Sequence, residues 1–115
     1  MANKLYAMEL LTEEVAKDVA ANPQEWMRFL NTASRLYRYT FPEQLLIYAQ
    51  RPGATAVASM EIWNQKMYRW IKKGSKGIAL IDNTSGPKTK LRYVFDVQDT
   101  YKVKNLGRED RKSVV

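Results

Sequence analysis

The sequence predicts an α+β fold in which N-terminal helices pack on a small antiparallel β-sheet. Apolar residues recur at three- and four-residue steps in the first half of the chain, and they alternate with other residues between about 67 and 97. Helical segments followed by a run of strands are typical of helices that cover one face of an antiparallel sheet. With 115 residues, of which 45% are hydrophobic, the chain is expected to form one domain, 1–115, with its core at about 22–99. We expect residues 1–11 and 105–115 to be flexible.

The first two helices are predicted from their start signals. A short peripheral helix is expected to begin at Thr12. The next helix is marked more strongly, because Asn22 can cap it, Pro23 suits its first turn and Glu25 stands at the spacing of a capping box. Apolar side chains then repeat with helical spacing, which predicts that this helix continues to about Tyr39.

Two shorter helices are predicted next. Thr40 and Glu43 repeat the capping-box pattern and predict a buried helix over "LLIYA", 45–49. The small apolar segment 54–59 is consistent with either a short strand or a close-packed connector. Ser59 can then cap a further helix that runs to about Lys66.

The strands are predicted from a change of period. "MYRWI" and "GIALI" flank the segment "KKGSKG" as strands flank a turn, which predicts a hairpin over about 67–82. Residues 83–90, "NTSGPKTK", have the composition of a loop. Residues 91–97, "LRYVFDV", alternate and are rich in β-branched and aromatic side chains, so we expect a third strand there.

Positive charge is concentrated in one segment of the chain. The net charge is +7, and residues 62–92 hold eight basic side chains and one acid, Asp82, whereas residues 1–61 hold six basic and seven acidic side chains. Such a segment attracts polyanions, of which nucleic acid comes first and an acidic protein face or anionic lipid comes after. The alternative is that these lysines only keep a solvated face soluble.

The turn between the two predicted hairpin strands is the centre of a candidate nucleic-acid site. Gly74 and Gly77 permit positive φ angles, so that N–H groups of the turn can form an anion-binding nest. Lysine ammonium groups around it can bind phosphate, and aromatic rings on the strands can stack on bases. The candidate nucleic-acid-binding residues are Lys66, Tyr68, Arg69, Trp70, Lys72, Lys73, Gly74, Lys76, Gly77, Lys88, Lys90, Arg92 and Tyr93.

Other aromatic residues are expected to have structural roles. Trp26 and Trp63 stand at apolar positions of predicted helices and are expected in the core. Tyr37, Tyr39 and Tyr48 are expected to pack with their hydroxyl groups at the rim of the core.

The composition excludes several kinds of catalytic site. The chain has no cysteine and no histidine, which excludes Cys/His zinc sites, histidine-based triads and cysteine nucleophiles. Asp96 and Asp99 are the close acidic pair near the basic segment; they could serve a metal nuclease, but acids so placed more often form turns or pair with a residue such as Arg92. We therefore expect no enzymatic activity, no catalytic residue, no metal site and no cofactor. No run approaches the roughly 20 apolar residues of a membrane span, and with no signal peptide at the N-terminus we expect a cytoplasmic protein.

The order of these motifs resembles a known family. "LLIYAQRP" is followed by "ATAVAS", then by Trp63, and then by "KGSKG" leading into an apolar strand. Over about residues 24–97 this resembles the N-terminal domain of ArdC-type antirestriction proteins, which also opens large helicase- and methylase-like proteins of conjugative elements. The resemblance implies single-stranded DNA binding, and the shared part of the motif includes Trp63, Lys73, Gly74, Lys76 and Gly77. Full antirestriction proteins continue into a metalloprotease-like domain with a His-Glu-x-x-His motif, which this sequence lacks because it has no histidine.

The expected function is therefore non-enzymatic binding of single-stranded DNA in a mobile genetic element, related to antirestriction or conjugative transfer. The expected partners are single-stranded DNA and, besides it, a helicase or methylase module. The alternative is a small anti-defence protein that inhibits a host restriction or CRISPR nuclease by binding it directly. Length-dependent binding to bare oligonucleotides favours the first function, and a stable complex with a nuclease favours the second.

Overall fold

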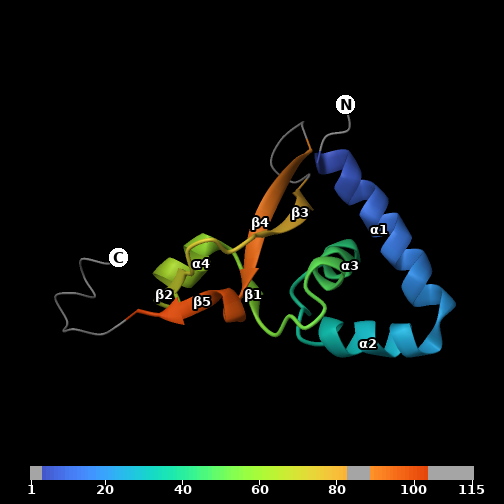
Figure 1. Ribbon diagram of the computed structural model, residues 1–115, viewed down its shortest axis with the longest axis horizontal. Helices are drawn as coiled ribbons and strands as arrows, with labels where there is room; N and C mark the ends of the chain where they lie inside the picture. The colour runs from blue at the N-terminus through green and yellow to red at the C-terminus, as the bar shows by residue number, and fades with distance from the viewer. Residues whose placement is uncertain (1–3, 83–88, 104–115) are drawn as a thin grey trace.

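The computed structural model describes residues 4–82 and 89–103 (Figure 1). Helices and short antiparallel strands together confirm the predicted α+β fold. The segment 105–115, expected to be flexible, lies outside the described residues. The elements are α1 (Lys4–Ala21), α2 (Pro23–Ala33), α3 (Phe41–Gln50), β1 (Val57–Ala58), α4 (Met60–Gln65), β2 (Arg69–Ile71), β3 (Ile78–Asp82), β4 (Lys90–Asp96), the 3-10 turn η1 (Val97–Asp99) and β5 (Thr100–Lys102).

The strands form two small antiparallel sheets. One sheet has the order β1-β4-β3, and the other contains β2 and β5. In Figure 1, α1, α2 and α3 lie on one side of β3 and β4, while α4, β2 and β5 form a smaller lobe on the other side. Because η1 joins β4 directly to β5, it also joins the two sheets. Across the described part of the chain, no helix is both long enough and apolar enough to cross a bilayer.

The prediction that 67–82 form a hairpin is wrong, because β2 and β3 pair with other strands. The free edge of β3 is occupied by a side chain. Gln50 Nε2 donates to the carbonyl oxygen of Ala79 over 2.9 Å, and the N–H of Ala79 donates to Gln50 Oε1 over 2.9 Å. Beyond β2, the N–H of Lys72 donates to the carbonyl oxygen of Asp99 over 2.8 Å, which holds this segment against η1. The backbone groups of β2 and β3 therefore bond to other parts of the chain and not to each other.

The N-caps predicted for three helices are confirmed, but Glu25 does not close a box with Asn22, because its carboxylate accepts from the Tyr48 hydroxyl and pairs with Arg28. Asn22 Oδ1 accepts two backbone N–H groups at the start of α2. Thr40 and Glu43 form the predicted reciprocal capping box at the start of α3. Ser59 Oγ accepts a backbone N–H at the start of α4. Local hydrogen bonding thus fixes where these helices begin.

Two helix boundaries differ from the prediction. α1 begins at Lys4 rather than at Thr12, because Thr12 Oγ1 donates to the carbonyl oxygen of Met8 over 2.8 Å and so lies within the helix. Met8 and the following turn of α1 pack against the core, which favours the longer helix. α2 ends at Ala33 rather than near Tyr39, and irregular turns lead from it to α3.

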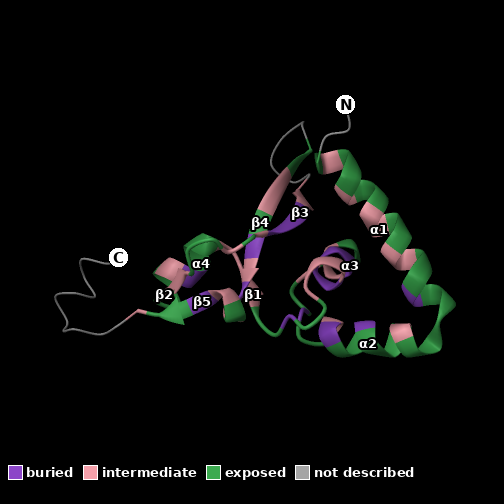
Figure 2. Cartoon of the chain, viewed as in Figure 1, coloured by how far each residue is buried: buried purple, intermediate pink, exposed green. Residues whose placement is uncertain are grey.

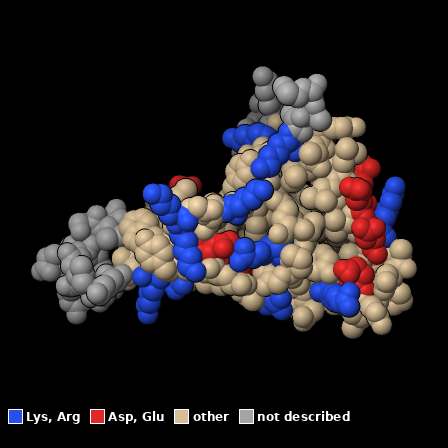
Figure 3. All heavy atoms as spheres, in the orientation of Figure 1, with Lys and Arg blue, Asp and Glu red and all other residues tan. Residues whose placement is uncertain are grey.

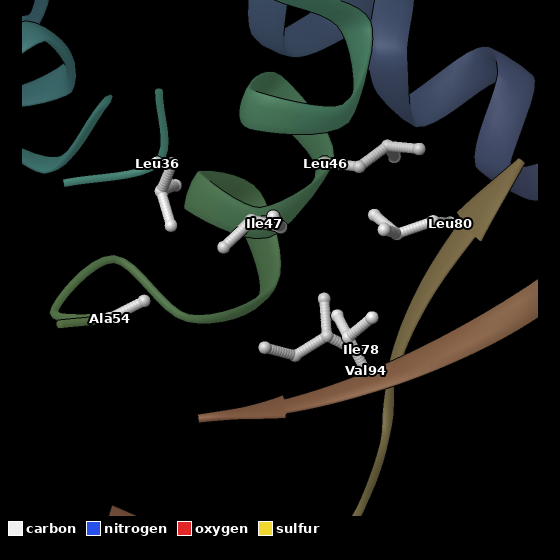
Figure 4. Packing of buried hydrophobic residues seen from close by; sticks show 7 residues of the cluster. All are labelled: Leu36, Leu46, Ile47, Ala54, Ile78, Leu80 and Val94. Carbon is white, nitrogen blue, oxygen red and sulfur yellow. The ribbon is translucent and has the colours of Figure 1, made fainter. Parts of the chain in front are cut away.

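The core lies between α3 and the sheet. Figure 4 shows the seven buried side chains of the main cluster, contributed by α3, β3, β4 and the loops that flank α3: Leu36, Leu46, Ile47, Ala54, Ile78, Leu80 and Val94. A second cluster joins α1, α2 and α3 through Val19, Phe29, Leu45 and Tyr48. Figure 2 shows that burial is concentrated where these elements meet, whereas the outer side of α1 is exposed.

The aromatic residues expected to pack divide into two groups. Trp63 is buried with 3% of its surface exposed, and its Nε1 donates to the carbonyl oxygen of Phe95 over 2.8 Å. Tyr48 is also buried, and Tyr39 is half-buried. The predictions for Trp26 and Tyr37 are wrong, since 38% and 76% of their surfaces are exposed. The irregular turn after α2 explains Tyr37, because the helical face that would have buried it ends at Ala33.

Candidate nucleic-acid interface

The lysine-rich segment between β2 and β3 is a turn fixed at one end to η1. The N–H of Ser75 donates to the carbonyl oxygen of Lys72 over 3.1 Å, which closes a four-residue turn. Gly74, its third residue, has a φ of 85°, a region that glycine enters without steric cost. Two groups of this turn, the N–H of Lys72 and the hydroxyl of Ser75, donate to the carbonyl oxygen of Asp99. The turn is thus held by contacts that the paired strands of a hairpin would not supply.

Gly77 has a different role from Gly74. It does not use the positive φ that glycine permits, since Gly74 is the glycine in the described residues with that conformation. A Cβ atom on Gly77 would lie 3.1 Å from Cβ of Tyr93 and 3.3 Å from Cζ of Phe95. Gly77 therefore stands where β4 side chains approach the backbone more closely than an added Cβ atom ordinarily allows.

The lysines of this region project into solvent. Within residues 4–82 and 89–103, no ion pair involves any of the five lysines that were named as candidates and are described. Lys72 Nζ donates to the carbonyl oxygen of Gln98 over 3.1 Å. Their charges are therefore not neutralised by described carboxylates at ion-pair distance. These exposed lysines are Lys66, Lys72, Lys73, Lys76 and Lys90.

The β2–β5 ribbon carries aromatic side chains next to these lysines. Trp70 lies opposite Tyr101 in the strand register, so both side chains share one face of the ribbon. Trp70 is half-buried, whereas Tyr101 has 49% of its surface exposed. Tyr68, which precedes β2, is 43% exposed and has a positive φ of 55°. Tyr101 was missed by the sequence analysis, which predicted no strand at 100–102.

Two candidate residues on neighbouring positions of β4 point to opposite faces of the sheet. Tyr93 lies on the outer face with 44% of its surface exposed, and Lys4 Nζ lies 5.3 Å from the centre of its ring. Arg92 points to the helical side, where its guanidinium forms a 2.6 Å ion pair with Glu43. The structure therefore separates Arg92 from the outer surface, and its charge is already paired.

The remaining candidates are placed as follows. Arg69 lies on the face of the ribbon opposite to Trp70, and its Nε donates to Thr100 Oγ1 over 2.7 Å. This hydrogen bond fixes Arg69 in position. Lys88 lies outside the described residues.

The two carboxylates that could have served a metal site are used structurally. Asp96 is fully buried, and its oxygens accept from the N–H groups of Thr55, Ala56 and Gln98 over 2.8–3.2 Å. Asp99 binds both terminal nitrogens of Arg51, at 2.9 and 3.3 Å. Asp96 therefore shapes the junction of β1, β4 and η1, and Asp99 joins η1 to the end of α3.

The charge distribution is uneven over the surface in Figure 3. Lysine and arginine side chains follow the strands and the smaller lobe, while acidic side chains gather over α1. No protein-family model, no curated protein and no solved structure matches this chain.

Proposed function

We propose that the chain binds single-stranded DNA without catalysing a reaction. The observation that carries this proposal is that the segments before and after the anchored Lys72–Ser75 turn carry both exposed aromatic rings and lysines that form no described ion pair. We call this set the lysine–tyrosine surface: Lys66, Tyr68, Lys72, Lys73, Lys76, Lys90, Tyr93 and Tyr101.

The two residue types on this surface suit the two parts of a single strand. Lysine ammonium groups attract backbone phosphates and release counterions, which gives affinity without sequence preference. Exposed tyrosine rings offer faces for unpaired bases, and each such stack is worth ~1–3 kcal/mol. A duplex keeps its bases stacked on each other, so it would use the lysines and leave the rings without partners. The surface therefore favours single strands.

The resemblance to the N-terminal domain of ArdC-type proteins supports the same proposal. In that family the domain is associated with single-stranded DNA. We extend this to a role in a mobile genetic element, where the chain would hold incoming single strands or deliver them to a helicase or methylase module. The anchored lysine–glycine turn is both a motif that resembles the family and a part of the lysine–tyrosine surface.

A titration of fluorescently labelled single-stranded DNA, duplex DNA and RNA at several salt concentrations tests the proposal. If four to six phosphates are neutralised, the slope of log K against log[salt] for single strands should be about −3 to −4, from ~0.7 per phosphate. Replacing Lys72, Lys73 and Lys76 by Ala should reduce the affinity and flatten this slope by ~0.7 for each lost contact. A flat salt response in the unmodified protein, or tighter binding of duplex, would contradict the proposal.

A second triple variant controls for net charge. Lys17, Arg28 and Arg38 are exposed and lie on α1, on α2 and in the loop after α2. Replacing these three by Ala lowers the net charge by the same amount but leaves the lysine–tyrosine surface intact. We expect single-strand affinity to stay within about twofold, because charges distant by more than a Debye length of ~8 Å are largely screened. Equal losses in both triple variants would show that only the net charge matters.

Binding of a host nuclease as an anti-defence protein is the second candidate function. It is favoured by large apolar side chains exposed on and after α2: Trp26, Met27, Leu30, Tyr37 and Phe41. Where such groups form one contiguous patch, they mark a protein-binding surface. This function predicts weak binding to every oligonucleotide and a stable complex with a restriction or CRISPR nuclease. The titration above therefore separates the two candidates.

A further inference from the structure

A basic pocket lies beside the lysine–tyrosine surface. Its volume is about 350 Å³, and it lies where the start of α1, the end of α3 and the segment before β3 meet. Three cationic side chains and no acidic one belong to its lining, which consists of Lys4, Met8, Gln50, Arg51, Lys76, Gly77 and Ile78. Lys4 and Arg51 were not predicted as site residues, because each stands far from the basic segment in the sequence.

Some polar groups of this pocket already have hydrogen-bond or ion-pair partners within the protein, and others do not. Gln50 has both of its amide hydrogens committed, since Nε2 donates to the carbonyl oxygens of Leu46 and Ala79. Arg51 is ion-paired with Asp99, so this pair adds no net charge. Lys4 and Lys76 are exposed and form no ion pair with any described residue. The pocket therefore carries a net charge of about +2, supplied by two lysine ammonium groups.

A phosphate monoester matches this charge better than the phosphodiester of an internal nucleotide. A monoester carries a charge of about −1.5 to −2 at neutral pH and has three acceptor oxygens. An internal phosphodiester carries a single negative charge, and its two ester bonds require the chain to leave the pocket on both sides. We propose that this pocket binds the terminal phosphate of the single strand, an inference that rests on the proposed function.

The ring of Tyr93 lies next to the pocket. Lys4 lines the pocket and also places its Nζ 5.3 Å from the centre of that ring. Gly77 lines the pocket too, and its missing side chain lets Tyr93 lie against the backbone. A terminal phosphate in the pocket would thus have its own or the next base beside the partly exposed side chain of Tyr93. This arrangement distinguishes the end of a strand from its interior.

The test compares one oligonucleotide sequence in three forms: with a 5′-phosphate, with a 3′-phosphate, and with hydroxyl groups at both ends. The full chain is used with any tag at its C-terminus, because Lys4 is close to the N-terminus. We expect one phosphorylated form to bind about tenfold more tightly than the hydroxyl form, as a charge-assisted contact typically gives. The form that gains identifies which end is held.

Two variants make this test specific. Lys4→Gln should remove most of the gain from the terminal phosphate. Lys17→Gln is the matched control, since it makes the same change on α1 about 20 Å further along the helix. It should retain the full gain. The gain is the affinity for the phosphorylated form divided by the affinity for the hydroxyl form of the same variant. A general loss of affinity therefore does not change it.

The outcomes separate this inference from the proposed function. Equal binding of all three forms, with a normal salt slope, overturns the pocket and leaves the proposed function standing. Absence of binding by all three forms overturns both. A gain that survives in Lys4→Gln also overturns the assignment, because the terminal phosphate would then be held elsewhere.

Discussion

Gln50 and Ala79 exchange two hydrogen bonds of 2.9 Å, although they lie 29 residues apart in the chain. The side-chain amide of Gln50 supplies a donor and an acceptor in the way that the backbone of a neighbouring strand would. Ala79 is fully buried, so without Gln50 its N–H and carbonyl groups would have no solvent to replace the lost bonds. One side chain of α3 therefore completes the edge of the sheet.

Replacing Gln50 by Leu should destabilise the protein, because Leu keeps much of the volume but makes neither bond. Each buried backbone group left unpaired costs about 1–3 kcal/mol. Chemical denaturation monitored by tryptophan fluorescence measures the loss. Gln24→Leu is the control, since Gln24 is exposed on α2 and should change the stability by no more than ~0.5 kcal/mol. Equal stabilities of the two variants would refute the role given to Gln50.

Alanine substitutions at three glycines should have three different effects. Gly77→Ala should destabilise by about 1–3 kcal/mol, because the new Cβ would meet Tyr93 at 3.1 Å. Gly74→Ala should cost about 1–2 kcal/mol through its φ of 85°, with open space around the methyl group. Gly53→Ala meets no atom within 4 Å and should be neutral or slightly stabilising. Melting curves of the three variants give this ranking directly, and a Gly77 variant as stable as the Gly53 variant would contradict the close approach.

A substitution of Trp63 should lower stability without changing DNA affinity, whereas a substitution of Tyr93 should lower DNA affinity. Trp63→Phe removes the donor to the carbonyl oxygen of Phe95 in a buried site and should cost about 1–3 kcal/mol of stability. Its affinity for single strands should stay unchanged once the protein is folded. Tyr93→Ala should reduce the affinity by ~1–3 kcal/mol while the salt slope stays constant, because stacking releases no counterion. Titration and denaturation of both variants are needed, and a changed salt slope in Tyr93→Ala would exclude simple stacking.

The stability of the fold should fall at alkaline pH partly because of Tyr39. Burial raises the pKa of the Tyr39 phenol above its usual range; the nearby guanidinium of Arg92 partly offsets this, and the carboxylate of Glu43 adds to it. A raised pKa in the folded state means that the contribution is complete below the unfolded pKa of about 10 and is lost as the pH rises through the folded value. Tyr39→Phe should flatten this decline, although it also loses the hydrogen bond to Val57.

Denaturation at several pH values between neutral and alkaline pH measures the effect. Burial and the hydrogen bond to Glu25 also raise the pKa of Tyr48, so part of the decline should remain in Tyr39→Phe. The double variant with Tyr48→Phe should show a flatter profile still. A profile that is as steep in the double variant as in the unmodified protein would rule out both phenols as its cause.

The parts of the fold that depend on neighbouring residues were predictable from the sequence. Thr40 and Glu43 are three residues apart and bond to each other's backbone, so their pattern is sufficient to place the start of α3. Alternation likewise marked β4. Strand pairing was not predictable in this way, because alternation shows that a segment is extended but does not identify its partner. The partner of β2 is a three-residue strand, β5, and the edge of β3 is closed by the side chain of Gln50.

The candidate site was predictable to a similar degree. The density of lysines pointed to the segment that forms the turn, and Tyr68 and Tyr93 are exposed, as a stacking role would require. Arg92 could not be assigned, because its pairing with Glu43 spans 49 residues. Tyr101 was missed, although the run of β-branched and aromatic residues after Asp99 was a signal for a further strand. Lys4 and Arg51 come to line the pocket beside it through tertiary packing, which no local pattern records.

The pairing of the strands has a consequence for the order in which this chain can fold. During synthesis β1, β2 and β3 are made first, but their partners β4 and β5 lie within residues 90–102. The early helices can form as they leave the ribosome, whereas both sheets must wait until β4 and β5 have been made. Contacts between distant segments slow folding, since the intervening chain must be closed into loops first. Until then the nascent chain presents three unpaired strands, so this is the stage at which it is most exposed to aggregation and most dependent on chaperones.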